Sequence, residues 1–378
     1  MSWSKWLAVG GALVGSILGF YGVMKSVPMA AAATAQTQHS GTDHVVEDPA
    51  YAAEGERLGK VAAAGLVGQP APAVAMTTID GAHIDLAKIY GQKPVYLKFW
   101  ATWCVPCRQQ MPGFENIYEK MGNRIQVVAV DIGFNDDEAA VRAYRKQMGL
   151  RMPIVMDDGS LGALFNLRVT PQHVLIGRDG RIAYVGHLAD QQLDAALQKV
   201  LSAPSGHRVV RALYRPSQPV FEPGEIVKGL QARTNSGARV VLGRGHAGRL
   251  QGVVFFSTWC ESYLATSRPA TAQACRRVRE QTDQLAAKGS VHWIGIAGGP
   301  WSTAADLADY QATTKTKIPL ALDTSGKLFR SFGVREIPTI ALIDGSGRLV
   351  RLIGPKDTDI QGAIQEVRMS RSQSTGRK

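Results

Sequence analysis

The chain has 378 residues, of which 45% are hydrophobic and 20% charged, which is enough for two or three domains with cores of their own. This composition excludes a wholly disordered chain. The formal net charge of +12 favours an acidic partner or anionic lipid headgroups. The basic residues are scattered and not interleaved with aromatic residues in a stripe, so the sequence gives little support to nucleic-acid binding.

The first feature along the chain is an uncharged apolar segment of 19 residues, from Trp6 to Met24, with a lysine on either side. A helix of this length crosses the hydrocarbon core of a bilayer. We therefore expect residues 1–25 to form an N-terminal transmembrane anchor, with the N-terminus in the cytoplasm and the rest of the chain outside. A cleaved signal peptide is the alternative, because residues 30–35 offer several small-x-small cleavage sites. Either interpretation exports the domains that follow.

Residues 26–65 are rich in Ala, Thr, Gln and His and show little periodicity, so we expect a flexible tether. Residues 66–203 then alternate between strand and helix patterns. The predicted strands cover residues 74–78, 95–100, 126–131, 174–176 and 182–186, and the predicted helices follow Cys107 and cover residues 136–148 and 191–201. This order predicts an α/β domain in which helices cover a central mixed sheet.

One stretch of this domain specifies a chemistry. Trp103-Cys104-Val105-Pro106-Cys107 lies between a predicted buried strand and a predicted helix. At the start of that helix, unpaired amides and the positive end of the dipole favour the Cys104 thiolate, which is the form that attacks disulfides. The spacing lets Cys107 resolve a mixed disulfide on Cys104. A zinc site would need a second ligand pair at short spacing, and a static disulfide would not need the neighbouring Trp and Pro, so we favour redox chemistry.

The string FWATWCVPC, which ends at Cys107, resembles the active-site strand and loop of the thioredoxin superfamily. It is most similar to the membrane-anchored periplasmic thiol-disulfide oxidoreductases of the TlpA and ResA kind. The resemblance extends from about Gly68 to about Val200 and includes a hairpin-like segment at residues 78–86. It implies a thioredoxin-like fold.

The resemblance assigns roles to individual residues. It implies that Cys104 is the attacking nucleophile and Cys107 the resolving thiol, and that no metal and no organic cofactor is required. Pro171 would be the cis-proline that faces the CxxC, whereas on general grounds a trans proline at the start of a strand is the alternative. The residues that would bind the substrate backbone are Trp103, Pro106, Thr170 and Pro171.

The resemblance also implies partners and a location. The substrates would be protein disulfides, for instance those of apocytochromes or metallochaperones, and a membrane thiol donor would supply the electrons. The enzyme would lie on the periplasmic side of a bacterial inner membrane, held by a single N-terminal span, or be soluble in the periplasm after signal cleavage. The direction of electron flow depends on a reduction potential that the sequence does not fix.

Two positions depart from the pattern of the superfamily. Thioredoxins place a buried Asp on the strand before the active site, and this chain has Lys98 there, so the usual proton acceptor for the second cysteine is missing. After the proline the chain continues with Gln172-His173, where small or hydroxylated residues are expected. We expect His173 to face a neighbouring strand, and a direct influence on Cys104 is the alternative.

The second half of the chain repeats the first. Cys104 aligns with Cys260 at an offset of 156 (260 − 104), and Pro171 aligns with Pro338 at an offset of 167 (338 − 171), so residues are inserted after Cys260. The sequence therefore predicts two tandem thioredoxin-like folds. The predicted segments are the active fold at 66–203, a proline-rich linker at 204–225, a degenerate fold at 226–367 and a disordered basic tail at 368–378.

The second repeat lacks the complete motif, because Tyr263 stands where the resolving cysteine would be. Ordinary dithiol exchange cannot occur there, so we expect this fold to be redox-degenerate and to serve client binding or structure. We predict a structural disulfide between Cys260 and Cys275. A second, unconventional redox pair and two unlinked thiols are the alternatives.

Two other function classes compete with an oxidoreductase. Peroxiredoxins of the same superfamily place Pro and Thr or Ser seven and three residues before the reactive cysteine. Leu97 and Ala101 stand there before Cys104, and the positions before Cys260 do not fit either. The other alternative is a non-enzymatic binding or assembly module, which suits the second fold alone.

Overall fold

The computed structural model describes most of the chain, and every described residue belongs to one unit of residues 42–378. The predicted membrane segment lies outside the described residues. No helix in the described part of the chain is long and apolar enough to cross a bilayer. The described residues are 49–204, 209, 210, 212, 220–243 and 249–375.

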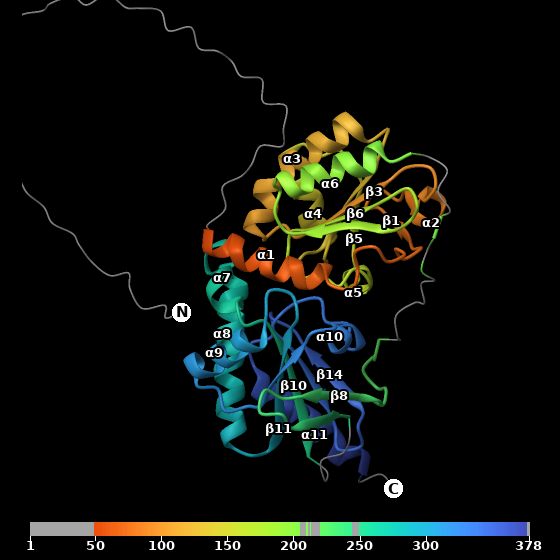
Figure 1. The fold of residues 1–378 in the computed structure, drawn as a ribbon. Helices are drawn as coiled ribbons and strands as arrows, with labels where there is room; N and C mark the ends of the chain where they lie inside the picture. Colours follow the sequence, from red (N-terminus) through yellow and green to blue (C-terminus); the bar gives the residue numbers. More distant parts are fainter. Residues whose placement is uncertain (1–48, 205–208, 211, 213–219, 244–248, 376–378) are drawn as a thin grey trace, which may run out of the picture. The chain divides into compact units, whose positions relative to one another are not determined.

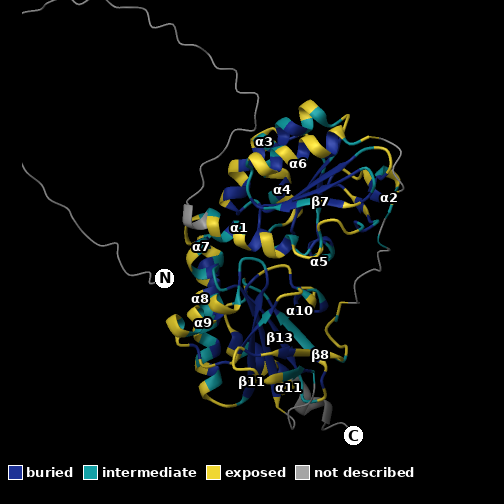
Figure 2. Cartoon of the chain, in the orientation of Figure 1, coloured by how far each residue is buried: buried dark blue, intermediate teal, exposed yellow. Residues whose placement is uncertain are grey.

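The first half is built on a five-stranded sheet of order β5-β4-β3-β6-β7, with helices lying against it (Figure 1). The central strand β3 pairs parallel with β4 and antiparallel with β6, which confirms the predicted mixed sheet. All six residues of β3 are buried, which fits its apolar and aromatic pattern, and Lys98 is the one charged residue of the strand (Figure 2). The elements are β3 (Val95–Trp100), α3 (Val105–Met121), β4 (Gln126–Asp131), α4 (Glu138–Met148), β5 (Ile154–Met156), α5 (Ser160–Leu164), β6 (Gln172–Ile176), β7 (Ile182–Gly186) and α6 (Gln191–Ser202).

The predicted strand at residues 74–78 is not a full member of this sheet and meets it at an isolated bridge between Thr78 and Val155 of β5. β1 (Ala75–Thr77) instead pairs with β2 (His83–Asp85) in a separate two-stranded sheet, followed by the short helix α2 (Leu86–Ile89). Gly81, with φ of 83°, provides the left-handed backbone that the turn between the two strands requires. The hairpin-like segment is therefore a hairpin, but it stands outside the main sheet.

The prediction of a flexible tether over residues 26–65 is wrong for its last part, because helix α1 covers Pro49–Ala63. Its buried positions are Gly55, Leu58, Gly59 and Ala62, which follow helical spacing. Two of the four are glycines, so the sequence does not show the apolar stripe that usually identifies such a helix. A Cβ on Gly55 would overlap the ring of His187, which shows how closely the helix packs against the residue after β7.

The second half contains a five-stranded sheet of order β12-β11-β10-β13-β14, the same order as in the first half. Its central strand β10 again pairs parallel with one neighbour and antiparallel with the other. The elements are β8 (Leu230–Arg233), β9 (Arg239–Leu242), β10 (Leu250–Phe256), α7 (Cys260–Ser267), α8 (Pro269–Ala287), β11 (Val291–Gly298), α9 (Ala304–Thr314), β12 (Leu320–Asp323), α10 (Lys327–Ser331), β13 (Thr339–Ile343), β14 (Leu349–Ile353) and α11 (Ile360–Thr375).

The two helices α7 and α8 occupy the region of the predicted insertion. Pro269 begins α8, because a proline is tolerated in the first turn of a helix but not inside one. At the other end of the chain, α11 continues to Thr375, so the prediction of a disordered tail at 368–378 is wrong for most of that range. The buried stripe that anchors α11 consists of Ile360, Ala363, Ile364 and Val367.

The close packing of α1 generates a stability prediction. The His187 ring cannot move away from a new methyl group easily, because its Nδ1 donates to the Pro171 carbonyl over 2.8 Å. Gly55→Ala should therefore lower the free energy of unfolding by about 1–3 kcal/mol, as overpacking typically does. Urea denaturation measures this change.

A matched control is Gly113→Ala within α3, where a Cβ would meet no atom within 4 Å. That substitution should stabilise the protein by about 0.5–1 kcal/mol through helix propensity alone. If both variants were stabilised equally, α1 would not pack as described.

Candidate active site

Cys104 and Cys107 lie at the N-terminus of α3, directly after the central strand. Cys104 is the N-cap residue, and its Sγ accepts a hydrogen bond from the backbone N–H of Cys107 over 3.2 Å. Pro106 occupies the first turn of the helix, where its missing N–H costs nothing. The two sulfurs form a disulfide with a Cα–Cα distance of 5.2 Å. The same N–H group is placed to stabilise a Cys104 thiolate after reduction.

The pairing of β3 with β6 brings the other predicted site residues to the cysteines. Phe99 near the end of β3 pairs with Gln172 at the start of β6, so the loop after β3 and the loop before β6 meet at one edge of the sheet. Thr170 and Pro171 immediately precede β6, and the peptide bond between them is cis. Trp103 is held at the same edge by a hydrogen bond from its Nε1 to the Phe134 carbonyl (2.7 Å).

Lys98 is part of a buried polar network beneath this edge. Its Nζ donates to Gln110 Oε1 over 3.3 Å, and it lies 5.5 Å from the centre of the Phe114 ring. Because Lys98 can only donate, Gln110 Oε1 must accept, so the 2.9 Å contact with His173 Nε2 is a donation from the histidine. His173 Nδ1 then accepts from the Tyr96 hydroxyl over 2.8 Å.

Burial, and then the Lys98 charge, lower the pKa of His173 well below its usual value. The ring is therefore neutral near pH 7 and acts as a hydrogen-bond link between β3 and α3. The sequence placed His173 against a neighbouring strand, and Lys98 is its register partner. Sequence analysis did not identify Gln110 as part of this network. The available signal was its spacing of three residues from Cys107, which puts both residues on the same face of α3.

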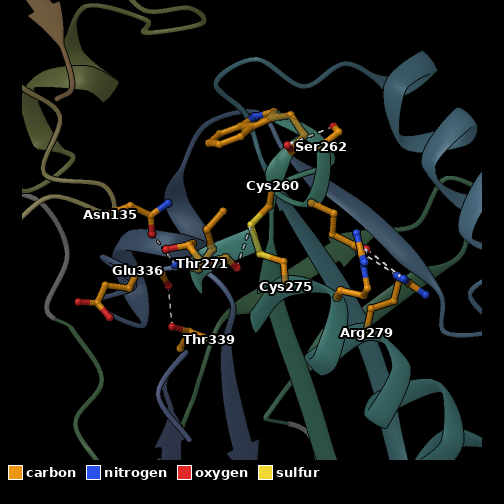
Figure 3. The surroundings of a disulfide bond; sticks show 12 residues. Asn135, Cys260, Ser262, Thr271, Cys275, Arg279, Glu336 and Thr339 are labelled. Carbon is orange, nitrogen blue, oxygen red and sulfur yellow. Dashed lines mark hydrogen bonds and ion pairs between the residues drawn. A yellow bond between two sulfur atoms is a disulfide. The ribbon is translucent and has the colours of Figure 1, made fainter. Parts of the chain in front are cut away.

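The second half carries a disulfide at the corresponding edge of its own sheet. Cys260 begins α7 after the central strand β10, and it is bonded to Cys275 of α8 with a Cα–Cα distance of 6.4 Å (Figure 3). Cys260 is wholly buried, and its Sγ lies 3.9 Å from the Thr271 carbonyl oxygen. Tyr263 lies one turn further along α7. The Ile337–Pro338 peptide bond, like that at Pro171, is cis.

A cavity of about 360 Å³ lies between the two halves. Trp103 and Asp157 of the first half and Trp259 and Arg335 of the second are among its lining residues. Burial raises the pKa of Asp157 to about 6, although the backbone N–H groups of Gly162 and Leu161 oppose the shift by donating to its carboxylate.

A second buried carboxyl group lies close to this cavity. Burial, followed by the nearby Asp136 carboxylate, raises the pKa of Asp131 well above its usual value. Both causes favour the protonated form of Asp131. Arg268 Nη2 lies 2.7 Å from Asp136 Oδ1.

The chain resembles known proteins over its first half. The AhpC/TSA family model matches residues 67–185. A thiol-disulfide oxidoreductase ResA of Bacillus cereus is 32% identical over 138 residues, which cover 35% of this chain and 78% of that protein. The thioredoxin-like protein YneN of Bacillus subtilis (strain 168) is 33% identical over 133 residues, covering 34% of this chain and 78% of YneN.

Solved structures give matches of similar extent. One match is the crystal structure of a thiol:disulfide interchange protein of the thioredoxin family from Chlorobium tepidum TLS. The sequence identity is 25%, the matched region covers 36% of this chain and 97% of the Chlorobium chain, and the TM-score is 0.33. The class of protein is thus a thioredoxin-like thiol-disulfide oxidoreductase. The chain belongs to the ResA-like family of these enzymes.

The placement of the two cysteines predicts unequal reactivity after reduction. Cys104 caps α3 and accepts a hydrogen bond from a backbone amide, whereas Cys107 lies inside the first turn of the helix. Iodoacetamide at neutral pH should therefore modify Cys104 first, as peptide mapping by mass spectrometry would show. Equal rates at the two thiols would contradict the assignment of Cys104 as the more reactive group.

The raised pKa of Asp157 predicts a pH dependence of stability. The folded state holds this proton more tightly than the unfolded state, so the free energy of unfolding should fall as the pH rises from about 4 to about 6. At about 1.4 kcal/mol per pKa unit, the loss amounts to roughly 3 kcal/mol at most. Urea denaturation between pH 4 and pH 7 measures it, and Asp157→Asn should make this slope smaller, while Asp131, whose pKa is also raised, still contributes to it.

Asp158→Asn is the control for that measurement. Burial acts to raise the pKa of Asp158, but hydrogen bonds from Ser160 outweigh burial and the pKa is lowered. The fall in stability should therefore persist in this variant. A slope that was equal in wild type and Asp157→Asn would contradict the proposed titration.

Proposed function

We propose that the chain is an exported, membrane-tethered reductase of protein disulfides that acts through Cys104 and Cys107. The single observation that carries the proposal is the CxxC pair at the start of α3, with a backbone amide directed at Cys104 Sγ. The ResA and YneN relatives support the class of reaction through their names. The substrates that we propose are protein disulfides such as those met in cytochrome c or metalloprotein maturation, with a membrane thiol donor as the source of electrons.

The reaction begins with both cysteines reduced. The Cys104 thiolate attacks one sulfur of the client disulfide, forms a mixed disulfide and releases the other client sulfur as a thiolate. Cys107, as a thiolate, then attacks Cys104 Sγ, releases the second client sulfur and leaves the Cys104–Cys107 disulfide. Two electrons pass to the client in one cycle, and a dithiol donor restores the enzyme by the reverse exchange.

Client binding is assigned to the residues around this pair. Trp103 precedes Cys104 and Pro106 follows it by two residues, and Thr170 and Pro171 lie in the loop before β6, which favours a client backbone that runs between the two loops. The second half lacks a cysteine at Tyr263, so we propose that it takes no electrons by dithiol exchange and that its disulfide is structural.

The location rests on the sequence of the N-terminal segment. Residues 1–25 hold an uncharged stretch long enough to cross a bilayer, and the charges around it favour a catalytic half on the periplasmic side. The alternative remains a signal peptide that is removed, with a soluble periplasmic product. N-terminal sequencing of the protein from its native host distinguishes the two.

Trapping and turnover test the reaction and its assignment to the first half. Cys107→Ser should accumulate mixed disulfides with clients, because the resolving thiol is absent, and Cys104→Ser should not. In an insulin-reduction assay with dithiothreitol, wild type should be active. The double variant Cys104→Ser/Cys107→Ser, which keeps the second disulfide, should fall to the uncatalysed rate.

Several results would contradict this proposal. Trapping by the Cys104 variant would reverse the roles of the two cysteines. Turnover by the double variant would assign redox activity to Cys260 and Cys275. Consumption of hydrogen peroxide by wild type, in place of insulin reduction, would favour the peroxidase alternative that the AhpC/TSA match leaves in view.

A further inference from the structure

The active-site loop of the first half lies against the second half of the same chain. The Trp103 ring stacks on the Trp259 ring with a centroid distance of 5.1 Å and an interplanar angle of 27°. On the other side of Cys104, the backbone N–H of Val105 donates to the Tyr263 hydroxyl over 3.0 Å. Both residues that flank Cys104 in the sequence therefore contact the second half.

The contacts between the halves occur in equivalent pairs. Arg168 donates from Nη1 to the Thr324 carbonyl, and Arg335 donates from Nη1 to the Asp157 carbonyl. Arg335 is the repeat of Arg168 at an offset of 167 (335 − 168), and the two acceptors lie in equivalent loops, Asp157 between β5 and α5 and Thr324 between β12 and α10. The same surface of each half thus meets its counterpart, as in a two-fold dimer interface.

A second pair of contacts follows the same rule. The Trp301 N–H donates to the Arg168 carbonyl over 2.9 Å, and the Asn135 N–H donates to the Arg335 carbonyl over 2.8 Å. Asn135 and Trp301 are equivalent residues, and both adopt a left-handed backbone, with φ of 58° and 56°. The reciprocal bonds indicate a built interface, because chance contacts between two domains would not repeat in register.

An ion pair adds to this interface beside the active site. Arg268 Nη2 donates over 2.7 Å to both Asp136 Oδ1 and Thr102 Oγ1, and its Nη1 donates to the Asn135 carbonyl. Ion pairs at the protein surface contribute little to stability. This pair differs, because the Asp136 side chain is wholly inaccessible to solvent. This burial makes the contact one that is costly to break by removing one partner.

The interface covers the groups to which we assign client binding. Cys104 is 1% exposed and Trp103 3% exposed, and Thr170 is wholly buried. The Thr170 hydroxyl accepts a hydrogen bond from Trp301 Nε1 over 3.0 Å. A client protein cannot place a disulfide on Cys104 while these contacts are made.

The Cys260–Cys275 disulfide encloses the segment that makes two of these contacts. Residues 260–275, which we call the latch segment, contain both Tyr263 and Arg268. Arg268 lies at the junction of α7 and α8, and the disulfide joins these two helices. The linkage therefore restricts the movement of the two side chains that lie beside Cys104.

We propose that the second half is a lid over the active-site face of the first, that the halves must part before a client disulfide reaches Cys104, and that the Cys260–Cys275 disulfide holds the latch segment in its closing position. This inference rests on the proposed function of Cys104. It gives the degenerate repeat a role, which is the control of client access.

The lid is tested with variants of a protein that comprises residues 26–378 and so contains both halves. Arg268→Ala removes the ion pair, Tyr263→Phe removes a single hydroxyl, and Cys260→Ser/Cys275→Ser releases the latch segment. Arg351→Ala is the matched control, because this arginine pairs with Glu366 inside the second half. The readouts are insulin reduction, the alkylation rate of reduced Cys104, and the radius of gyration by small-angle scattering.

Client access should scale with the open fraction of the molecule. Arg268→Ala and the double cysteine variant should therefore raise the rate of insulin reduction by about tenfold and increase the radius of gyration. Tyr263→Phe should raise the rate by a smaller factor, and Arg351→Ala should match wild type. Peptide mapping without reductant confirms the Cys260–Cys275 linkage in the variants that retain it.

Unchanged insulin rates in folded Arg268→Ala and in the double cysteine variant would overturn the lid while leaving the proposed reductase intact. If no variant and no wild type reduced insulin, the proposed function would fail. The lid would then be judged by the alkylation rate of reduced Cys104, and a rate that is the same in these variants as in wild type would overturn it. If Arg268→Ala did not fold, Tyr263→Phe and the double variant would decide by the same measurements.

Discussion

The antiparallel pairing of β3 with β6 is the constraint on which the site depends. It joins segments that are more than 70 residues apart, and the Phe99–Gln172 pair fixes where the loop after one strand meets the loop before the other. A register shift of one residue would turn Lys98 and His173 to the opposite face of the sheet and break their links to α3. The meeting of the loop that holds Cys104 with the loop that holds Pro171 therefore follows from sheet register and not from the CxxC motif alone.

Two of the buried ionisable groups have different kinds of partner. Lys98, where thioredoxins carry an acid, is surrounded by a neutral network in which Gln110 accepts from it and burial keeps His173 uncharged. Asp136 instead is paired with Arg268 of the other half. The Lys98 network lies within the first half and stabilises that half alone. The Asp136–Arg268 pair instead makes the environment of a buried carboxylate depend on the second half.

The sequence was sufficient for the features that have a local signal. The apolar run before Cys104, the strand-to-helix transition and the repeat offset gave the mixed α/β sheet and the place of the cysteines. It failed for α1, because Gly55 and Gly59 make contacts as small residues and carry no apolar signal. It also gave no indication of the interface, since Arg268 and Asp136 are 132 residues apart and each alone resembles a solvated surface charge.

The paired contacts give a physical reason for the loss of the motif in one repeat. Two identical active-site faces that meet across a two-fold axis cover each other, so neither can admit a client while both are closed. When the two repeats are joined in one chain, their sequences can differ while the halves stay together. The second half has kept the surface residues that pair with the first, such as Arg335, and has replaced the resolving cysteine by Tyr263, whose hydroxyl accepts from the Val105 amide beside Cys104. Tyr263, at the position equivalent to Cys107, thus contacts the loop that carries the Cys104–Cys107 pair.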